Sequence, residues 1–191
     1  MSDVTSSLTV GCQAVIVVAF GTSTAAKVTG RAAYADFQHW LSASAGVPSR
    51  LAPAVAVVAV AAEAATAVAM VVPPLVPAGF MVATVLLIVL TASVQSMIRR
   101  RVRVPCRCFG AGRHPPGTAH LARNLTLLVA AAGGLVMTTT SAGPAPFGSA
   151  WVLAATAGVA GALLLINLEE IITLARPVST GPRPRAREET P

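Results

Sequence analysis

The sequence predicts an all-α fold: a polytopic membrane bundle of about five transmembrane helices, with a short cysteine-bearing loop between helices three and four. Only 11% of the 191 residues are charged and 54% are hydrophobic, whereas a soluble domain usually carries about 25% charged residues. Five segments contain the roughly 20 apolar residues that a helix needs to cross a bilayer. Basic residues alternate between the connections of these segments, as in multi-span proteins.

Five apolar segments along the chain are long enough to be membrane spans. The expected spans are residues 8–28, 51–72, 78–98, about 121–140 and 150 to about 174. The first lacks a basic leader and an obvious cleavage site, which favours a span over a signal peptide. Small residues recur in every segment and allow helices to approach closely in a membrane. We expect an integral membrane domain over residues 1–174 and a disordered, basic C-terminal tail over residues 175–191.

The distribution of basic residues predicts the orientation in the cell membrane. They occur in every second hydrophilic segment: Lys27, Arg31 and Arg50; Arg99, Arg100, Arg101, Arg103, Arg107, Arg113 and Arg123; and Arg176, Arg183, Arg185 and Arg187. The positive-inside rule then places the N-terminus outside and both the cysteine loop and the C-terminus in the cytoplasm. The net charge of +7 comes from basic residues that flank the apolar spans and orient them in a lipid bilayer. The bilayer is therefore the expected partner, and no nucleic acid is expected.

Two of the three cysteines lie in one arginine-rich loop, "RRRVRVPCRCFGAGRHPP", residues 99–116. Cys106 and Cys108 are one residue apart, so a disulfide between them would close a small, strained and easily reduced ring. The neighbouring arginines favour the reactive thiolate over the thiol. This spacing indicates a possible thiol–disulfide oxidoreductase, with Cys106 and Cys108 as the catalytic pair.

The same cysteines have two other interpretations. Together with His114 and His120 they form C-x-C-x5-H-x5-H, a set that could ligate zinc or copper through two sulfur and two nitrogen atoms. They could also be structural, with neither role. No nucleotide loop, haem motif or protease motif is present, so we predict no cofactor.

Several motifs resemble the methylamine utilisation protein MauE family. The first is "CRCFG", followed by "ARNLTLL" at the start of the fourth span. The others are "FGTSTAAKVTGRAAYADFQHWL", which begins in the first span with Lys27 and continues into a short segment with Phe37, and Glu63 in the second span. The likeness covers roughly residues 8–140, and the cysteine motif with Arg123 and Asn124 is its most specific part. It implies a DoxX-like membrane protein associated with processing, transport or maturation of the disulfide-rich β-subunit of methylamine dehydrogenase.

Residues near the cysteines have expected roles in the proposed chemistry, and the resemblance supports the role of Arg123. Phe109 would pack the loop against the bundle, and Gly110 would permit the turn that returns the thiols toward Arg123. Arg123 would then stabilise a thiolate; alternatively, Arg123 and Asn124 anchor and cap the fourth span. The charge pattern places the thiols in the cytoplasm, which disfavours a simple external oxidase. The partner would be a thiol-bearing or redox protein.

Glu63 lies deep in the second expected span. A carboxylate at mid-membrane costs roughly 2.5–3.5 kcal/mol on insertion scales, so it usually has a partner or a role. Lys27 is the nearest candidate by depth and could reach Glu63 along its flexible stem. A structural ion pair, a protonated glutamate and a proton relay that serves the thiols all remain open.

Other polar or aromatic residues have simpler expectations. Cys12 should be a buried small hydrophobe, and Trp40 and Trp151 should be interfacial anchors. Asn167, Glu169 and Glu170 should solvate the end of the fifth span. Two further function classes remain: a non-catalytic scaffold or chaperone, and a transporter of a small substrate or metal ion.

Overall fold

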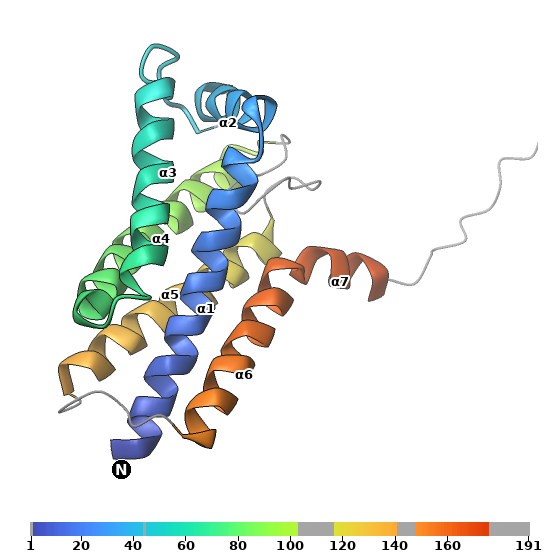
Figure 1. Cartoon of the computed structure of the whole chain (residues 1–191). Helices are drawn as coiled ribbons and strands as arrows, with labels where there is room; N and C mark the ends of the chain where they lie inside the picture. Colours follow the sequence, from blue (N-terminus) through green and yellow to red (C-terminus); the bar gives the residue numbers. More distant parts are fainter. Residues whose placement is uncertain (1, 44, 103–116, 141–147, 176–191) are drawn as a thin grey trace, which may run out of the picture.

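The computed structural model describes residues 2–43, 45–102, 117–140 and 148–175, all of which form helices or short connections (Figure 1). The cysteine loop from residue 103 to residue 116 lies outside the described residues. The elements in chain order are α1 (Ser2–Val28), α2 (Arg31–Ala43), α3 (Ala52–Ala69), the 3-10 turn η1 (Pro73–Leu75), α4 (Val76–Arg99), α5 (Thr118–Thr140), α6 (Ser149–Ile166) and α7 (Leu168–Ala175).

The prediction of an all-α, multi-pass membrane protein is confirmed. Among the described residues five helices are long and apolar enough to cross a membrane: α1, α3, α4 with the preceding turn, α5 and α6. Their outward faces carry large exposed apolar side chains, such as Val58, Val129 and Leu153. Such a surface is unfavourable in water but matches lipid acyl chains.

The bundle is organised around α1, which packs against α6, α5 and α3, while α4 packs against α5 and α3 (Figure 1). Two apolar clusters fill the interior. The central core consists of Ile16, Ala19, Phe20, Met70, Phe80, Ala83, Leu87, Leu127 and Ala131. The α2 cluster consists of Phe37, Trp40, Leu41, Ala52, Ala56, Val94 and Met97.

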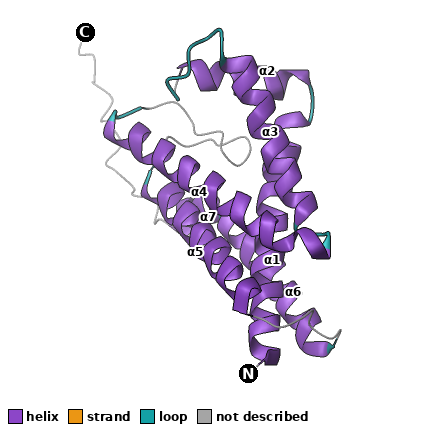
Figure 2. Ribbon diagram, turned by 90° about the vertical axis from the view of Figure 1, so that its left-hand side faces the viewer, coloured by secondary structure: helices purple, strands orange, loops and turns teal. Residues whose placement is uncertain are grey.

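The helix α2 is an element that the sequence interpretation missed. It is too short to span a bilayer, and its apolar residues Phe37, Trp40 and Leu41 are spaced as one helical stripe. This stripe is buried against α3 and α4, so α2 lies across the end of α1 (Figure 2). The expectation that Trp40 anchors the membrane interface is wrong, because its side chain is buried inside this cluster.

The expected single span over residues 150–174 is also wrong, because the helix breaks near residue 167. The side-chain Nδ2 of Asn167 donates a hydrogen bond to the Leu163 carbonyl at 2.8 Å. Such local bonding competes with regular helix geometry. The spanning helix α6 therefore ends at Ile166, and α7 leaves its axis (Figure 1).

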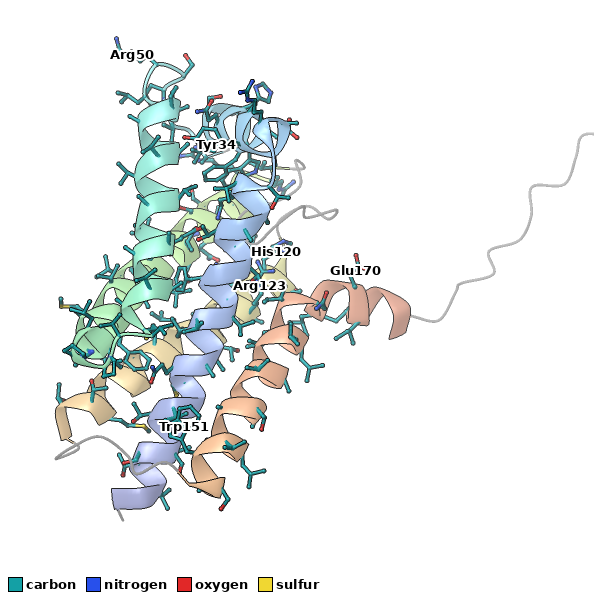
Figure 3. All side chains as sticks on the ribbon, in the orientation of Figure 1. Tyr34, Arg50, His120, Arg123, Trp151 and Glu170 are labelled. Atoms are coloured by element: carbon teal, nitrogen blue, oxygen red, sulfur yellow. The ribbon has the colours of Figure 1, made fainter. Side chains whose placement is uncertain are left out.

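The two ends of the bundle differ in charge. The end of α1, α2, the start of α3, the end of α4 and the start of α5 lie together, opposite the N-terminus (Figure 2). We call this the α2 end. Its exposed basic side chains are those of Arg31, Arg50, Arg99, Arg100 and Arg101. Trp151 lies at the opposite end (Figure 3).

Candidate functional site

A band of buried polar side chains crosses the interior of the bundle. We call it the polar layer. It contains every buried polar or charged side chain in the described ranges: Ser23, Lys27, Glu63, Thr66, His120, Arg123 and Asn124. These residues come from α1, α3 and α5, so three separate spans contribute to it. Burial of so many polar groups in a membrane bundle is costly, which makes the layer the first candidate for function.

The register of α1 and α5 places their polar residues at the same level. On α1, Ser23 follows the core residue Phe20 by three positions; on the antiparallel α5, Asn124 precedes the core residue Leu127 by three. Each step is about one helical turn toward the α2 end. On both helices the residues thus change from apolar to polar about one turn beyond the central core, toward the α2 end.

The helix α3 follows the same scheme. Glu63 lies one turn before Ala67, which packs against the central core, and one turn after Ala59, which packs against the α2 cluster. It is also about 16 Å from the first residue of α3, at about 1.5 Å per residue. The polar layer is therefore enclosed between two apolar clusters.

Lys27 and Glu63 form a buried ion pair. The Lys27 Nζ lies 2.8 Å from Oε1 and 2.7 Å from Oε2 of Glu63. The Ser23 hydroxyl donates to the same Oε2 at 3.0 Å and accepts from Lys27 Nζ at 2.7 Å. The pairing suggested by depth is thus present. Lys27 and Ser23 face Glu63 together because they are four residues apart on α1.

Such an arrangement offsets much of the cost of burial. Lys27 and Glu63 are 3% and 4% exposed, and an isolated charge in this environment would be strongly unfavourable. Both carboxylate oxygens and the ammonium group have charge-assisted partners, which are the stronger class of hydrogen bond. The pair links α1 to α3 and is electrically neutral overall, so the bilayer can accommodate it.

The helix α2 covers the Lys27–Glu63 ion pair at the α2 end of the bundle. Lys27 Nζ lies 5.1 Å from the centroid of the Phe37 ring, a cation–π distance. The Phe37 ring stacks on Trp40 with centroids 6.1 Å apart. Lys27 is one residue from the end of α1, yet it does not reach water, because α2 covers it.

The start of α5 contributes His120, Arg123 and Asn124. These residues are spaced i, i+3 and i+4 in the first two turns, so they share one face of the helix. All three are buried, and Figure 3 shows His120 and Arg123 beside α1 rather than on the outer surface. The side chain of Arg123 therefore faces the interior, which disfavours the alternative in which it anchors the membrane interface.

Asn124 is the least satisfied of these groups. Its side chain is 0% exposed, and within the described part of the chain neither Oδ1 nor Nδ2 has a hydrogen-bond partner. A buried amide without partners costs roughly 1–3 kcal/mol. A buried polar side chain that costs stability in this way calls for an explanation, and a functional role is one such explanation.

The predicted site residues fall into two groups. Lys27, Glu63, Arg123 and Asn124 all belong to the polar layer. The others lie outside the described residues: Cys106, Cys108, Phe109, Gly110 and His114. The alternative metal set shares this limit, since only His120 of its four members is described. In the described ranges no group of three His, Cys, Asp or Glu residues could hold a metal ion.

Two members of the layer were not singled out from the sequence. Ser23 and Thr66 are small hydroxyl residues in apolar helices, where such residues usually bond to their own backbone. Thr66 does so, through the Ala62 carbonyl at 2.7 Å. Ser23 donates to Glu63 on the neighbouring helix α3, and its spacing of four from Lys27 was the available signal.

Cys12 lies apart from the polar layer. It lines an apolar pocket of about 500 Å³ between α1, α5 and α6, together with Leu8, Val15 and Ala154. Its thiol is free and only half-buried, whereas we expected a buried small apolar side chain. It is therefore no part of the candidate site.

Comparison with known proteins agrees with the motifs. Residues 5–137 match the family model described as methylamine utilisation protein MauE. This range covers nearly all of α1 to α5 and the whole polar layer. No curated protein and no solved structure matches the chain. Because the family match covers more than half of the sequence, this multi-pass membrane protein belongs to the MauE family.

Proposed function

We propose that this protein is a membrane thiol–disulfide exchange factor that assists the maturation of a partner protein. Cys106 and Cys108 are its reactive pair. The observation that carries the proposal is the buried face of α5, where His120, Arg123 and Asn124 follow the cysteine loop directly in sequence. A polar, positively charged interior beside a dithiol is the environment that stabilises a thiolate.

The proposed exchange is balanced without a further cofactor. A thiolate of the partner attacks the Cys106–Cys108 disulfide, so one sulfur–sulfur bond breaks and a mixed disulfide forms. The second thiolate of the partner then attacks that mixed disulfide. The partner is oxidised to a disulfide, and Cys106 and Cys108 are reduced and take up two protons. The reverse sequence reduces a disulfide of the partner.

The polar layer supports this chemistry in two ways. The Arg123 guanidinium favours the thiolate over the thiol, and Asn124 offers a donor and an acceptor to a group that changes charge. The Lys27–Glu63 pair holds α1 against α3 and gives the layer a fixed frame. Preorganised polar groups of this kind lower the cost of forming charge at a reacting atom.

The family points to the type of partner. The MauE family is named for methylamine utilisation, and the disulfide-rich β-subunit of methylamine dehydrogenase is the partner in that pathway. For this chain the partner is a protein that carries thiols or disulfides near the membrane. The reactive pair supplies the chemistry, whichever protein is the substrate.

The exchange reaction is tested by trapping. Cys106→Ser and Cys108→Ser variants, each also carrying Cys12→Ala, are expressed in cells and separated by non-reducing electrophoresis. One of them should accumulate a mixed disulfide that reductant releases, whereas the matched protein without cysteines should not. If neither variant traps a partner and the native pair stays reduced under mild oxidants, the proposal is wrong. Bound zinc or copper that is lost on replacing His114 or His120 would then favour the metal site.

The orientation of the exchange site is part of the proposal. The exposed arginines gather at the α2 end, so we propose that this end and the cysteine loop face the cytoplasm and the N-terminus faces outside. A variant with Cys12→Ala and Cys106→Ala retains Cys108 alone. Its thiol should react with an impermeant maleimide only after lysis. Labelling of intact cells would contradict this orientation.

Transport is the second candidate function, because buried ionisable residues in spanning helices often mark substrate or ion pathways. The Lys27–Glu63 pair is the observation that favours it. Reconstituted protein would then move a proton or small ion, and Glu63→Gln would abolish that flux without affecting mixed-disulfide trapping. An ion flux that requires Glu63, together with the absence of a trapped mixed disulfide, would favour transport as the function.

A further inference from the structure

We propose that Phe37 and Trp40 are positioning residues: they transmit the state of the Lys27–Glu63 pair to the end of α4, where the cysteine loop begins. The value of this coupling for catalysis rests on the proposed exchange function. The coupling itself is a statement about described residues and can be tested without the native cysteines.

The first link is the contact between the ion pair and α2. Lys27 Nζ faces the Phe37 ring at 5.1 Å from its centroid, and the strength of this contact depends on the charge and place of the ammonium group. Loss of charge on Glu63 weakens its two hydrogen bonds from the ammonium group and so changes the place of that group. The Phe37 ring is nearly parallel to that of Trp40, with an interplanar angle of 14°, so the two rings must move together.

The second link is the contact between α2 and α4. Phe37 and Trp40 share the α2 cluster with Val94 and Met97 of α4, and Val102 packs against the same cluster. A second contact fixes the neighbouring chain: Gly46 has a φ of +76°, and a Cβ there would meet the Arg100 guanidinium at 3.3 Å. The end of α4 is thus seated on α2 and the connection after it.

The third link is the way in which α4 ends. Arg101 has a φ of +54°, its N–H donates to the Ile98 carbonyl at 3.0 Å, and the N–H of Val102 donates to the Met97 carbonyl at 3.1 Å. These two bonds form a Schellman motif, in which Val102 and Met97 make the accompanying apolar contact. Glycine usually occupies the left-handed position; an arginine there is held by its surroundings.

Together these links form one continuous path. Lys27 of the ion pair contacts Phe37, and Phe37 stacks on Trp40. Both rings belong to the α2 cluster, which includes Met97 and against which Val102 packs. Val102 is the last described residue before the loop, and Cys106 follows four residues later in the sequence. A shift in the ion pair therefore has a physical route to the place where the loop leaves α4.

The test uses a reporter thiol at residue 102. The full chain carries Cys12→Ala, Cys106→Ser, Cys108→Ser and Val102→Cys, and its alkylation rate by a maleimide is measured in detergent. Glu63→Gln should change this rate by at least about threefold, the factor that corresponds to a cation–π contact of ordinary strength. In a chain that also carries Phe37→Leu, Glu63→Gln should change it by less than about 1.5-fold.

Two controls make the result specific. Phe80→Leu removes an aromatic ring from the central core, and there the threefold response to Glu63→Gln should persist. Lys27→Arg keeps a cation beside Glu63 and provides a second perturbation if Glu63→Gln does not fold.

The fluorescence of Trp40 gives an independent readout. In a chain with Trp151→Phe, the emission maximum of Trp40 should shift with either perturbation only when Phe37 is present.

An equal response of residue 102 with and without Phe37 would overturn the coupling. Because the reporter chain has no native cysteine, that outcome would leave the exchange proposal untouched. A failure to trap mixed disulfides would overturn the exchange proposal and leave this coupling in place.

Discussion

The helix α1 makes two very different contacts. Near its C-terminal end it meets α3 through the Lys27–Glu63 pair and Ser23. Near its N-terminal end it meets α6 through bare backbone: a Cβ on Gly158 would lie 2.4 Å from the Gly11 carbonyl oxygen. The first contact depends on charge and the second on close packing.

The close-packed contact of α1 with α6 needs only helix assembly to explain it, whereas the charged contact of α1 with α3 needs a further reason. Small residues allow helices to pack closely where no hydrophobic drive exists between them, and the α1–α6 contact needs nothing more. A buried ion pair is a costly way to join two helices, since apolar residues of similar volume often stabilise as well or better. The family match includes the ion pair and ends before α6. The residues of the polar contact therefore lie within the matched segment, whereas α6 lies outside it.

Breaking the ion pair from one side should have the largest effect on stability. Lys27→Met leaves Glu63 buried beside Ser23 without its cation, and the free energy of unfolding should fall by about 3–5 kcal/mol. The measurement is denaturant unfolding in detergent micelles. The double variant Lys27→Met with Glu63→Leu should recover most of the loss. Equal losses in the single and double variants would show that the site does not behave as a buried ion pair.

The close-packed contact should respond to size alone. Gly158→Ala places a methyl group against backbone atoms of α1, and we expect a loss of about 1–3 kcal/mol from overpacking. Gly161→Ala, three residues along the same helix, meets nothing within 4 Å and should be neutral or slightly stabilising. A comparable loss in both variants would mean that helix propensity, and not contact with Gly11, limits α6.

The smallest effect on stability is expected at Asn124. Asn124→Leu removes two buried polar atoms that have no hydrogen-bond partner among the described residues, so the free energy of unfolding should stay unchanged or rise by about 1 kcal/mol. Disulfide exchange with the trapped partner should nevertheless slow. Ser23→Ala is the contrasting control, because it deletes a hydrogen bond to Glu63 and should destabilise by about 1–3 kcal/mol. A clear loss of stability in Asn124→Leu would make Asn124 structural.

Much of the fold was predictable because membrane spans follow from composition. The length of the apolar segments predicted five spans, and the single glutamate in the second span pointed to a pairing with Lys27. The break at Asn167 was not predictable, since one asparagine in an apolar run is compatible with a continuous helix. The helix α2 was missed because no span-length signal marks it. Its stripe of Phe37, Trp40 and Leu41 was readable only as a short amphipathic pattern.

The candidate site was predictable in identity but not in arrangement. Arg123 and Asn124 stood out through their motif, whereas their burial depends on the tilt and register of α5 against α1, which sequence spacing does not determine. Ser23 and His120 joined the layer for the same reason. The position of Trp40 could not be inferred either, because an aromatic residue near a basic segment fits both an interface and a covered cluster.

The most direct test of the account is whether buried Arg123 activates the cysteine pair. Reduced protein carrying Cys12→Ala is alkylated at pH 7, and the rate is compared between Arg123→Gln and Arg101→Gln. Arg101 is exposed at the same end of the bundle, so solvent screens its charge. We expect the alkylation rate to fall about tenfold in Arg123→Gln, to recover in Arg123→Lys, and to change less than about twofold in Arg101→Gln. An unchanged rate in Arg123→Gln would contradict the activation of the cysteine pair by Arg123.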